Sequence, residues 1–285
     1  MRFKAPRIAS MLLAFIAAAW LPLASRAKDE KLKPEELIAK HLESIGSADK
    51  RSAVKSRTTA GNTQVVFRVG GSGILNGKGN LLSEPNSVRL GLAYNAVEYP
   101  GEQIAFDGNK VSVGQVSPGV RSPLSNFLLE NDVLLREGLL FGSLSSSWTL
   151  LDVAGKQPKL TSNGIKKIDG RQLYELKYEP RRRGNIQQLW LYFDPETFRH
   201  VRSEYKMERS TTRVNRITDS AELARYTIVE QFEDFKQVDG LTLPYSYKLD
   251  FSIDAPDGGI LTGWSYLVEK ISHNDPLDRR LFAVQ

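Results

Sequence analysis

The sequence predicts a mainly β (α+β) protein built on one strongly bent antiparallel sheet that wraps around helices. About a dozen stretches alternate between apolar and polar residues with a period of two, which is typical of half-buried strands. Turn signals such as Asp107-Gly108 and Asp239-Gly240 separate these stretches. Helical patterns stand at the N-terminus and in one interruption of the strands. Because so many strands in one domain must curl or split into two sheets, we expect strong curvature.

The clearest hairpin lies between residues 186 and 207, where an Asp194-Pro195 turn separates two alternating stretches. The stretch before the turn, which contains Leu191 and Phe193, is apolar on both faces. The stretch after the turn is apolar on one face and charged on the other. That second apolar face comprises Val201, Ser203, Tyr205 and Met207. We therefore expect one side of the hairpin to face water and the other to face a core or an apolar cavity.

Residues 1–27 have the organisation of a secretory signal peptide. Basic residues precede an apolar run from Ile8 to Leu23, and Ser25-Arg26-Ala27 offers small residues at the positions that a signal peptidase reads. The run is shorter than the ~20 residues that a membrane-spanning helix needs, and an uncleaved N-terminal anchor is the alternative interpretation. We expect export to the periplasm and a single domain over residues 28–285.

The charge balance argues against a nucleic-acid partner. The whole chain has a net charge of +6, and removal of residues 1–27 leaves 35 basic and 33 acidic residues. A nearly neutral protein lacks the concentrated basic face that nucleic-acid binding needs. The chain also has no cysteine, which excludes disulfides, thiol catalysis and a lipid-modified N-terminal cysteine.

The N-terminal part of the domain is predicted to be helical. Pro34–Ile45 places its apolar residues on one stripe, and Gly46 follows as a stop signal. Ser47–Lys55 is expected to add a second short helical turn. Strands are then expected over Thr58–Val69, Gly73–Ser83, Ser87–Asn95, Gln103–Phe106 and Lys110–Gln115.

Arg121–Ser147 interrupts the strands with apolar residues at helical spacings. Asn131-Asp132 is suited to end one helix and to cap the next, so the segment is predicted to form two short helices. Such helices could cover one end of the sheet as ordinary core, or they could form a lid over a hydrophobic cavity. The residues alone leave both interpretations open.

Strands resume after this interruption and continue towards the C-terminus. They are predicted over Trp148–Val153, Lys159–Ile168, Arg171–Glu179, the two arms of the hairpin, Arg225–Phe235, Thr242–Phe251 and Ile260–Ser272. Glu208–Ala224 is polar and contains Arg209, Arg213 and Arg216, so we expect an exposed connection. Such a basic loop is usually solvated, and contact with an acidic partner or a lipid headgroup is the alternative.

Catalytic and metal-binding patterns are missing from the sequence. His41, His200 and His273 have no ligand spacing, and each is expected at the surface. Neither a nucleophile elbow nor a phosphate-binding loop is present. Carboxylates on predicted strands, such as Glu204 and Glu230, leave a glycosidase pair open, because spacing in sequence does not fix separation across a sheet. We expect no enzymatic activity, no metal and no cofactor.

Several segments resemble a known family. They are PEELIAKHLESIG, SADKRSAVKSR, DGRQLYELKYEP, LWLYFDPETFRHVRSEY and FEDFKQVDGLTLPYSYKLDF. Together with the signal peptide, they are similar to the LolA/LolB-like periplasmic lipoprotein carriers, and more closely to the exported proteins called outer-membrane lipoprotein-sorting proteins. The resemblance covers most of residues 34–251.

The resemblance implies an incomplete β-barrel around the N-terminal helix, with a short helical lid over an apolar cavity that receives acyl chains. Arg121–Ser147 would be the lid. The implied function is carriage of lipid or of lipoprotein acyl chains between membranes, by a monomer that meets an inner- or outer-membrane transport complex. The family also locks its lid with an arginine, which the matching segments do not place in this chain. Alternatives are a non-catalytic cell-envelope scaffold or interaction protein with a filled barrel, and a secreted hydrolase.

Burial of apolar surface would drive such binding. A lipid tail gains about 0.8 kcal/mol per buried CH₂, so an apolar wall holds it with few polar groups. The candidate lipid-binding residues of the lid are Phe127, Leu134, Leu135, Phe141 and Trp148. Those of the wall are Leu191, Phe193, Val201 and Tyr205.

Overall fold

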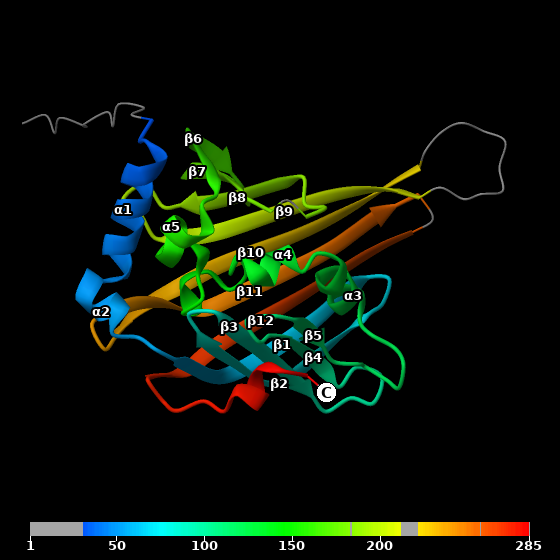
Figure 1. Ribbon diagram of the computed structural model, residues 1–285. Coiled ribbons are helices and arrows are strands. Elements are labelled where there is room, and N and C mark those ends of the chain that lie inside the picture. The colour runs from blue at the N-terminus through cyan, green and yellow to red at the C-terminus, as the bar shows by residue number, and fades with distance from the viewer. Residues whose placement is uncertain (1–30, 183, 212–221, 257, 285) are drawn as a thin grey trace, which may run out of the picture. The chain divides into compact units, whose positions relative to one another are not determined.

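The computed structural model describes residues 31–182, 184–211, 222–256 and 258–284 (Figure 1). The predicted signal peptide and the basic residues Arg213 and Arg216 lie outside the described residues. Contacts group the chain from Lys31 onwards into one unit. The architecture of that unit is therefore the frame for the candidate site.

The described residues form a 12-stranded antiparallel sheet. One run of strands consists of β1 (Arg57–Val69), β2 (Gly73–Glu84), β3 (Ser87–Tyr94), β4 (Gly101–Phe106) and β5 (Val111–Val113). The other run consists of β6 (Lys159–Ile168), β7 (Arg171–Glu179), β8 (Gln188–Phe193), β9 (His200–Thr211), β10 (Glu222–Val238), β11 (Leu241–Ala255) and β12 (Gly258–His273). Across the sheet, the order is β5-β4-β3-β2-β1-β12-β11-β10-β9-β8-β7-β6.

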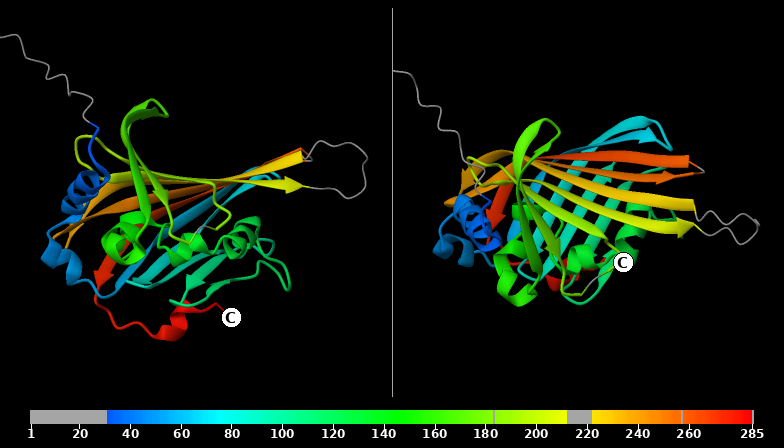
Figure 2. Two further views of the ribbon diagram at one scale, coloured as in Figure 1. Left: turned by 45° about the horizontal axis from the view of Figure 1, so that its top comes forward. Right: turned by 90° about the horizontal axis from the view of Figure 1, so that it is seen from above.

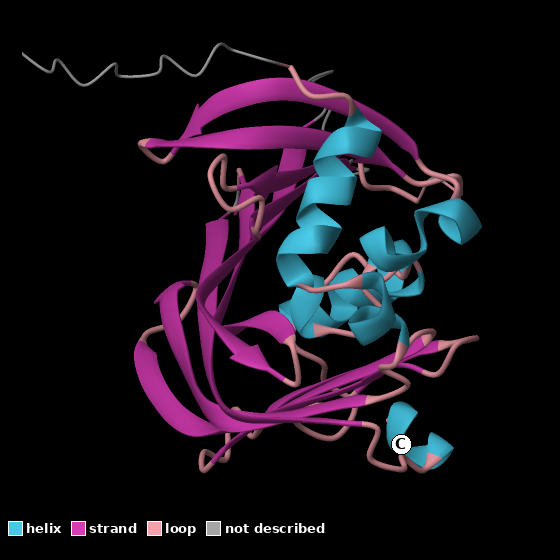
Figure 3. Ribbon diagram, turned by 90° about the vertical axis from the view of Figure 1, so that its left-hand side faces the viewer, coloured by secondary structure: helices cyan, strands magenta, loops and turns pink. Residues whose placement is uncertain are grey.

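The order of the strands leaves the sheet open. Strands β1 to β5 are consecutive neighbours, as are β6 to β12, and the pairing of β12 with β1 joins the two runs. The edges of the sheet are therefore β5 and β6. Residues 114–158, here called the insertion, connect these two edges. The sheet curves around the insertion and around α1 (Pro34–Ile45), as Figure 3 shows. This is the curved, incomplete barrel that was expected from sequence.

Short helices make up much of the insertion. They are α3 (Pro123–Glu130), α4 (Val133–Arg136), η1 (Gly142–Leu144), η2 (Thr149–Asp152) and α5 (Val153–Lys156), where η denotes a 3₁₀ helix. The other helices are α1, α2 (Ala48–Ser52) and η3 (Arg279–Phe282). Two further views show α1 and the insertion on the same, concave side of the sheet (Figure 2). In the described part of the chain, no helix has the length and apolar character needed to span a membrane.

Most elements lie where the sequence predicts them. Helix α1 and strands β6 and β7 have the predicted bounds, and Asn131-Asp132 separates α3 from α4 as expected. Strands β9 and β10 are longer than predicted and take up both ends of the polar connection 208–224. The predicted strand Trp148–Val153 is wrong, because Thr149–Asp152 forms η2. A short apolar run does not distinguish a strand from a helix, which is why alternation fails there.

The two faces of the sheet differ as the hairpin predicts. On the convex face of β9, Glu204 forms ion pairs with Arg202 and Lys206. On the concave face, Leu191 and Tyr205 belong to the main hydrophobic core. The concave side is therefore the apolar side, and it is the side on which the helices lie.

Val201 does not share a face with Tyr205, so this part of the prediction is wrong. The β8–β9 register shifts between Tyr192 and Phe193, which leaves a bulge in β9. Val201 consequently joins Leu173 and Tyr192 in a small cluster that is separate from the main core. Because a bulge adds one residue to a strand, two residues an even number of positions apart across it point to opposite faces. Alternation in the sequence does not reveal such a bulge.

Candidate functional site

The insertion fills the concave side of the sheet. Its helical half, residues 123–136, comprises α3 and α4, and its irregular half, residues 137–152, includes η1 and η2. The predicted lid residues belong to the main hydrophobic core and have exposed fractions of 0 to 3%. They are Phe127, Leu134, Leu135, Phe141 and Trp148. Both halves of the insertion therefore contribute predicted lid residues to the core.

The structure brings these lid residues together with three of the four predicted wall residues. Leu191, Phe193 and Tyr205 are buried in the same core, whereas Val201 lies in the separate cluster on the other face. The ring of Trp148 stacks on His200 with a centroid distance of 4.7 Å, and His200 lies 5.5 Å from Phe193. Lid and wall thus meet through aromatic rings.

Each half of the insertion places an aromatic ring on the long strands. In the helical half, Phe127 stacks on Tyr226 at 5.6 Å and lies 5.3 Å from the ring of Phe251. In the irregular half, Phe141 contacts Tyr247 edge to face at 5.9 Å. Rings at these distances and angles are in favourable contact.

The space between the insertion and the sheet is nearly filled, and a void beside Arg57 and Ser146 has a volume of about 30 Å³. A void among apolar side chains has a volume of about 10 Å³, which is about the room for one water molecule. Its lining residues are Leu90, Leu92, Glu102, Leu124, Tyr247, Leu249, Trp264 and Tyr266. The family resemblance implies an apolar cavity here, but the protein's own side chains occupy it. A hydrocarbon chain would need the insertion to move.

Arg57, the first residue of β1, ties the irregular half to the sheet. Its Nη1 donates to the carbonyl oxygens of Ser143 at 2.6 Å and Leu144 at 3.2 Å, and its Nε donates to Nε2 of His273 at 3.0 Å. Burial lowers the pKa of Arg57 to about 10, so the side chain stays charged at neutral pH. Because a buried charge is costly without partners, Arg57 and these carbonyls stabilise each other.

Glu230 on β10 binds the same half of the insertion. Its Oε1 accepts hydrogen bonds from the backbone N–H of Phe141 at 2.7 Å and from the hydroxyl of Tyr247 at 2.8 Å. Its Oε2 lies 2.8 Å from the hydroxyl of Tyr205, which also lies 2.7 Å from the carbonyl oxygen of Leu139. Phe141 has a φ of 71°, a conformation that few non-glycine residues adopt, and the bond to Glu230 helps to hold it.

The position of one proton links Glu230 to the insertion. A phenol has a single hydrogen, so Tyr205 donates either to Leu139 or to Glu230. When Glu230 is protonated on Oε2, it donates to Tyr205, Tyr205 donates to Leu139, and every group is satisfied. Burial raises the pKa of Glu230 from its ordinary value of 4.5 to about 7, although hydrogen bonds to the carboxylate act in the opposite direction. The protonated carboxyl therefore fits this geometry best.

Two histidines are buried beside these bonds, so the prediction that they lie at the surface is wrong. Nε1–H of Trp148 donates to Nε2 of His41 at 3.1 Å, and Nδ1 of His41 lies 3.1 Å from the carbonyl oxygen of Phe198. Because an indole nitrogen only donates, these bonds assign His41 as neutral with its proton on Nδ1. Burial lowers the pKa of His41 to about 4, and it also lowers the pKa of His200.

Two further side chains of the sheet reach the irregular half. Oγ of Ser83 on β2 accepts from the backbone N–H of Ser146 at 2.9 Å. The hydroxyl of Tyr178 on β7 lies 2.7 Å from Oγ1 of Thr149. Polar groups from five strands, β1, β2, β7, β9 and β10, thus bind this half of the insertion. Its position is specified by hydrogen bonds as well as by apolar packing.

The helical half is anchored differently. Oε2 of Glu102 on β4 accepts from the hydroxyl of Ser125 at 2.8 Å, and Oε1 accepts from the hydroxyl of Tyr99 at 2.7 Å. Burial raises the pKa of Glu102. At the end of α3, Arg209 of β9 forms a surface ion pair with Glu130. This half therefore depends on one buried carboxylate, surface contacts and apolar packing.

Sequence alternation misses Arg57, Glu102 and Glu230 because it assigns polar strand residues to the wet face. Glu230 does carry a signal, since Ile228 and Phe232 lie two residues away on either side and share its face. A glutamate between apolar residues of one strand face is a candidate for a buried functional group. Arg57 carries no comparable signal, because it begins its strand.

The buried polar groups bind segments of this chain. Both carboxylate oxygens of Glu102 and of Glu230 have partners within the protein. Among the described residues, no group of three or more His, Asp or Glu side chains is placed to hold a metal ion. The chemistry of the arrangement is to hold a segment that covers an apolar surface.

Comparisons with known proteins find similarity only at the level of structure. No protein-family model matches the sequence, and no curated protein sequence matches it significantly. A DUF1329 family protein from Desulfovibrio piger is similar over 87% of this chain and 96% of that chain, with 11% identity and a TM-score of 0.44. A domain described as an outer membrane lipoprotein-sorting protein, from Vibrio parahaemolyticus, is similar over 86% and 97%, with 10% identity and a TM-score of 0.42. A chain of the Pseudomonas aeruginosa MucA/MucB complex is similar over 84% and 99%, with 12% identity and a TM-score of 0.21.

Proposed function

We propose that this protein is a non-catalytic periplasmic carrier, which holds acyl chains of a lipid or lipoprotein against the concave face of its sheet. The insertion fills that space when no cargo is bound. The topology supports this most directly, because the insertion connects the two edges of an open sheet. Its movement uncovers the apolar face without breaking any pairing between strands.

The energies allow such an exchange. A chain of about 12 buried CH₂ groups gains about 10 kcal/mol, which is comparable to the stability of a whole domain. Each hydrogen bond between the insertion and the sheet contributes only about 1 kcal/mol net. Burial of a lipid tail can therefore offset the loss of several of these bonds.

A reversible disulfide tests whether the insertion has to move. Oγ of Ser83 on β2 and Oγ of Ser146 on the insertion are 3.0 Å apart, and the chain has no cysteine of its own. The double variant Ser83→Cys, Ser146→Cys is expected to lock the insertion when oxidised. We expect the reduced variant to bind a fluorescent fatty acid in a titration and the oxidised variant to lose this binding.

The same sample after reduction is the matched control for the locked protein. Recovery of binding on reduction would exclude damage to the fold. Equal binding in the oxidised and reduced states would contradict the proposal, because the ligand would then lie elsewhere. Mass spectrometry of lipids extracted from the purified protein provides an independent measurement, and near-stoichiometric acyl chains would support carriage.

The filled interior favours a second candidate, a cell-envelope scaffold in which the insertion is permanent core. The void of about 10 Å³ is too small for an acyl chain, and the buried bonds of Arg57 and Glu230 suit a fixed segment. In that case, lipid extracts would be clean, and neither the oxidised nor the reduced double variant would bind the fatty acid. A hydrolase is not favoured by any buried carboxylate described above.

A further inference from the structure

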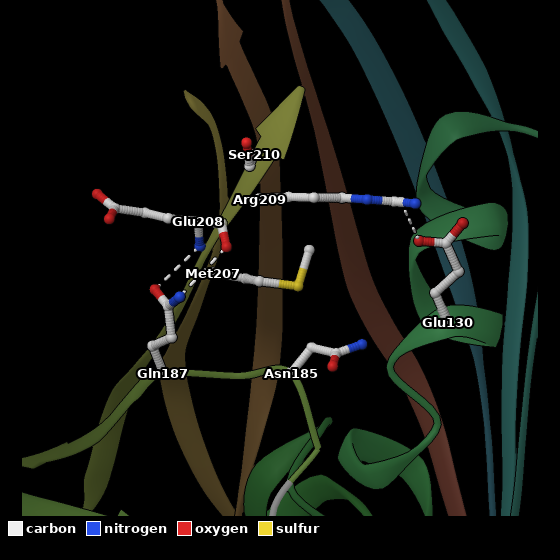
Figure 4. Close-up of a pocket in the computed structure, with 7 residues that line it drawn as sticks. All are labelled: Glu130, Asn185, Gln187, Met207, Glu208, Arg209 and Ser210. Atoms are coloured by element: carbon white, nitrogen blue, oxygen red, sulfur yellow. Dashed lines mark hydrogen bonds and ion pairs between the residues drawn. The ribbon is translucent and has the colours of Figure 1, made fainter. Parts of the chain in front are cut away.

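An open pocket lies at the outer end of β9 (Figure 4). Its volume is about 710 Å³. Its lining residues are Glu130, Asn185, Gln187, Met207, Glu208, Arg209 and Ser210. Three parts of the chain meet there, namely the outer part of β9, the segment that precedes β8, and the end of α3. The pocket therefore borders the helical half of the insertion.

The pocket continues the concave face of β9 outwards. Tyr205, Met207 and Arg209 are alternate residues of one strand and so share a face. Tyr205 and Met207 are buried, whereas Arg209 is exposed. At about 3.3 Å per residue, this row is about 13 Å long, which is the scale of an acyl chain segment. It leads from the pocket to the contact between Tyr205 and the irregular half.

The floor of the pocket adjoins the contacts of α3. Met207 pairs in register with Tyr226 of β10, and the ring of Tyr226 stacks on Phe127 of α3 at 5.6 Å. Phe127 lies one turn before Glu130, the last residue of α3. A chain that enters over Met207 therefore meets Phe127 first.

The pocket lies where β9 continues beyond the first residue of β8 and no longer has β8 paired beside it. The backbone N–H of Gln187 donates to the carbonyl of Lys206 at 3.0 Å, and beyond this point β8 no longer pairs with β9. The side-chain amide of Gln187 then donates to the carbonyl of Glu208 at 3.2 Å and accepts from its N–H at 3.0 Å. One amide side chain thus satisfies the edge of β9 and leaves space beside Met207.

An exposed ion pair spans the opening of the pocket. Nη1 of Arg209 lies 2.9 Å from Oε2 of Glu130, and the two side chains are 58% and 54% exposed. Figure 4 shows both side chains reaching across from opposite walls, with Met207 and Asn185 beside them. Exposed pairs of this kind are weak, so a partner can be exchanged. Glu130 is also disfavoured by the helix dipole at the end of α3, and Arg209 compensates for this.

We infer that this pocket receives the oxyanion headgroup of the cargo, a carboxylate or a phosphate, and that the cargo is an anionic lipid. The inference rests on the proposed carrier function. Arg209 exchanges Glu130 for the headgroup, because a planar guanidinium forms paired hydrogen bonds with either oxyanion. The exchange releases the end of α3, and the tail lies over Met207 in the place of Phe127.

Four twelve-carbon probes separate the contribution of the headgroup from that of the tail. They are dodecanoate, dodecyl phosphate, dodecanol and dodecyltrimethylammonium, and calorimetric titration measures their binding to the purified protein. We expect both anions to bind about tenfold more tightly than dodecanol, because only they form charge-assisted bonds with Arg209. The cation is expected to bind more weakly than dodecanol. A preference for dodecanoate indicates a fatty acid as cargo, and a preference for dodecyl phosphate indicates a phospholipid.

Three variants test which residue causes the preference for anionic probes over dodecanol. Arg209→Gln is expected to reduce the affinity for both anions to that for dodecanol, and to change the affinity for dodecanol by less than about twofold. Glu130→Gln removes the competitor of the headgroup and is expected to raise the affinity for both anions about threefold. Arg68→Gln is the matched control, because Arg68 forms an exposed ion pair with Asp250 at 2.9 Å and neither residue lines the pocket. It should leave the selectivity unchanged.

The outcomes separate this inference from the carrier function. If the anions and dodecanol bind wild-type protein equally, or if Arg209→Gln keeps the preference for anions, the headgroup site is wrong and the carrier function stands. If none of the four probes binds, the carrier function itself is wrong.

Discussion

The two halves of the insertion are buried alike but anchored differently. Phe127 in the helical half and Phe141 in the irregular half both pack on aromatic rings of the sheet. The irregular half is also hydrogen-bonded to Arg57, Glu230 and three other side chains of the sheet. Among the described residues, the helical half has one comparable buried anchor, Glu102.

This difference indicates which half can move. Apolar contacts can be transferred from a phenylalanine to a lipid tail, because burial of apolar surface is non-directional. A buried hydrogen bond cannot be transferred in this way, and its loss leaves two groups unsatisfied. We therefore expect α3 and α4 to lift first, and the irregular half to follow them when an acyl chain is bound.

Removal of a buried leucine should have a larger effect in the irregular half. Leu144 of η1 and Leu128 of α3 are both fully buried, so substitution by alanine removes the same atoms in each half. The cost depends on how far the surroundings relax into the cavity, and Arg57 holds the backbone at Leu144 in place. We expect the free energy of unfolding, measured with urea, to fall by about 4 kcal/mol for Leu144→Ala and about 2 kcal/mol for Leu128→Ala. Equal losses would show that both halves are equally rigid.

Replacement of Arg57 should be nearly as damaging. Arg57→Met leaves the carbonyls of Ser143 and Leu144 buried without a donor, so we expect a loss of about 3 kcal/mol in unfolding free energy. Arg89→Met is the matched control, because Arg89 also donates to a backbone carbonyl, that of Leu281 at 2.9 Å, but at the surface. It should cost less than about 1 kcal/mol. Similar losses for the two variants would contradict the role of Arg57 as a buried anchor.

Because Glu230 has a raised pKa in the folded protein, we expect the free energy of unfolding to depend on pH. Between pH 4.5 and about 7, the folded protein binds a proton at Glu230 that the unfolded chain does not bind. The contribution of Glu230 is therefore complete below pH 4.5 and is lost as the pH rises through 7, by up to about 3 kcal/mol. Glu230→Gln keeps a donor towards Tyr205 and removes this loss. Urea unfolding of both proteins across this range should show a difference that grows with pH.

His41 acts in the opposite direction and has to be separated from Glu230. Its folded pKa is about 4, so between pH 4 and 6.5 the unfolded chain binds the additional proton and stability rises with pH. The wild-type curve is therefore flattened, whereas Glu230→Gln should show the rise due to His41. His41→Gln lacks the rise due to His41, whereas the contributions of His200 and Glu102 are common to all three proteins. A difference between wild type and Glu230→Gln that does not change with pH would refute the proton assignment.

The fold and the apolar part of the site were predictable, because the period of the apolar residues records which face of each element is buried. This period predicted the positions of α1, of the antiparallel strands and of the helices of the insertion. It also singled out Phe127, Phe141 and Tyr205, which were predicted to line a lipid cavity and which belong to the main hydrophobic core. The register shift that moves Val201 to the other face leaves no trace in the period, since a bulge is set by the pairing of two strands.

The polar anchors were not predictable in the same way. His41 meets Phe198 and Trp148 across 157 and 107 residues of sequence, and no local pattern records such a meeting. Glu230 could have been suspected from its apolar neighbours on one strand face, but its bond to the backbone of Phe141 could not. The helical half was therefore recognisable from sequence, while the way in which the irregular half is held became visible only in the folded chain.

Amide hydrogen exchange compares the two halves without any substitution and should show the smallest difference. The N–H groups of Phe141 and Ser146 bond to side chains of the sheet, whereas those of Asn126 and Asn131 bond to carbonyls within or beside α3. If the helical half opens alone, the amides of Asn126 and Asn131 exchange during this local opening, and those of Phe141 and Ser146 stay protected. We expect at least about tenfold faster exchange in α3, which corresponds to about 1.4 kcal/mol. Equal protection of all four amides would mean that the insertion opens as one piece, and the comparison between its halves would then describe packing without describing motion.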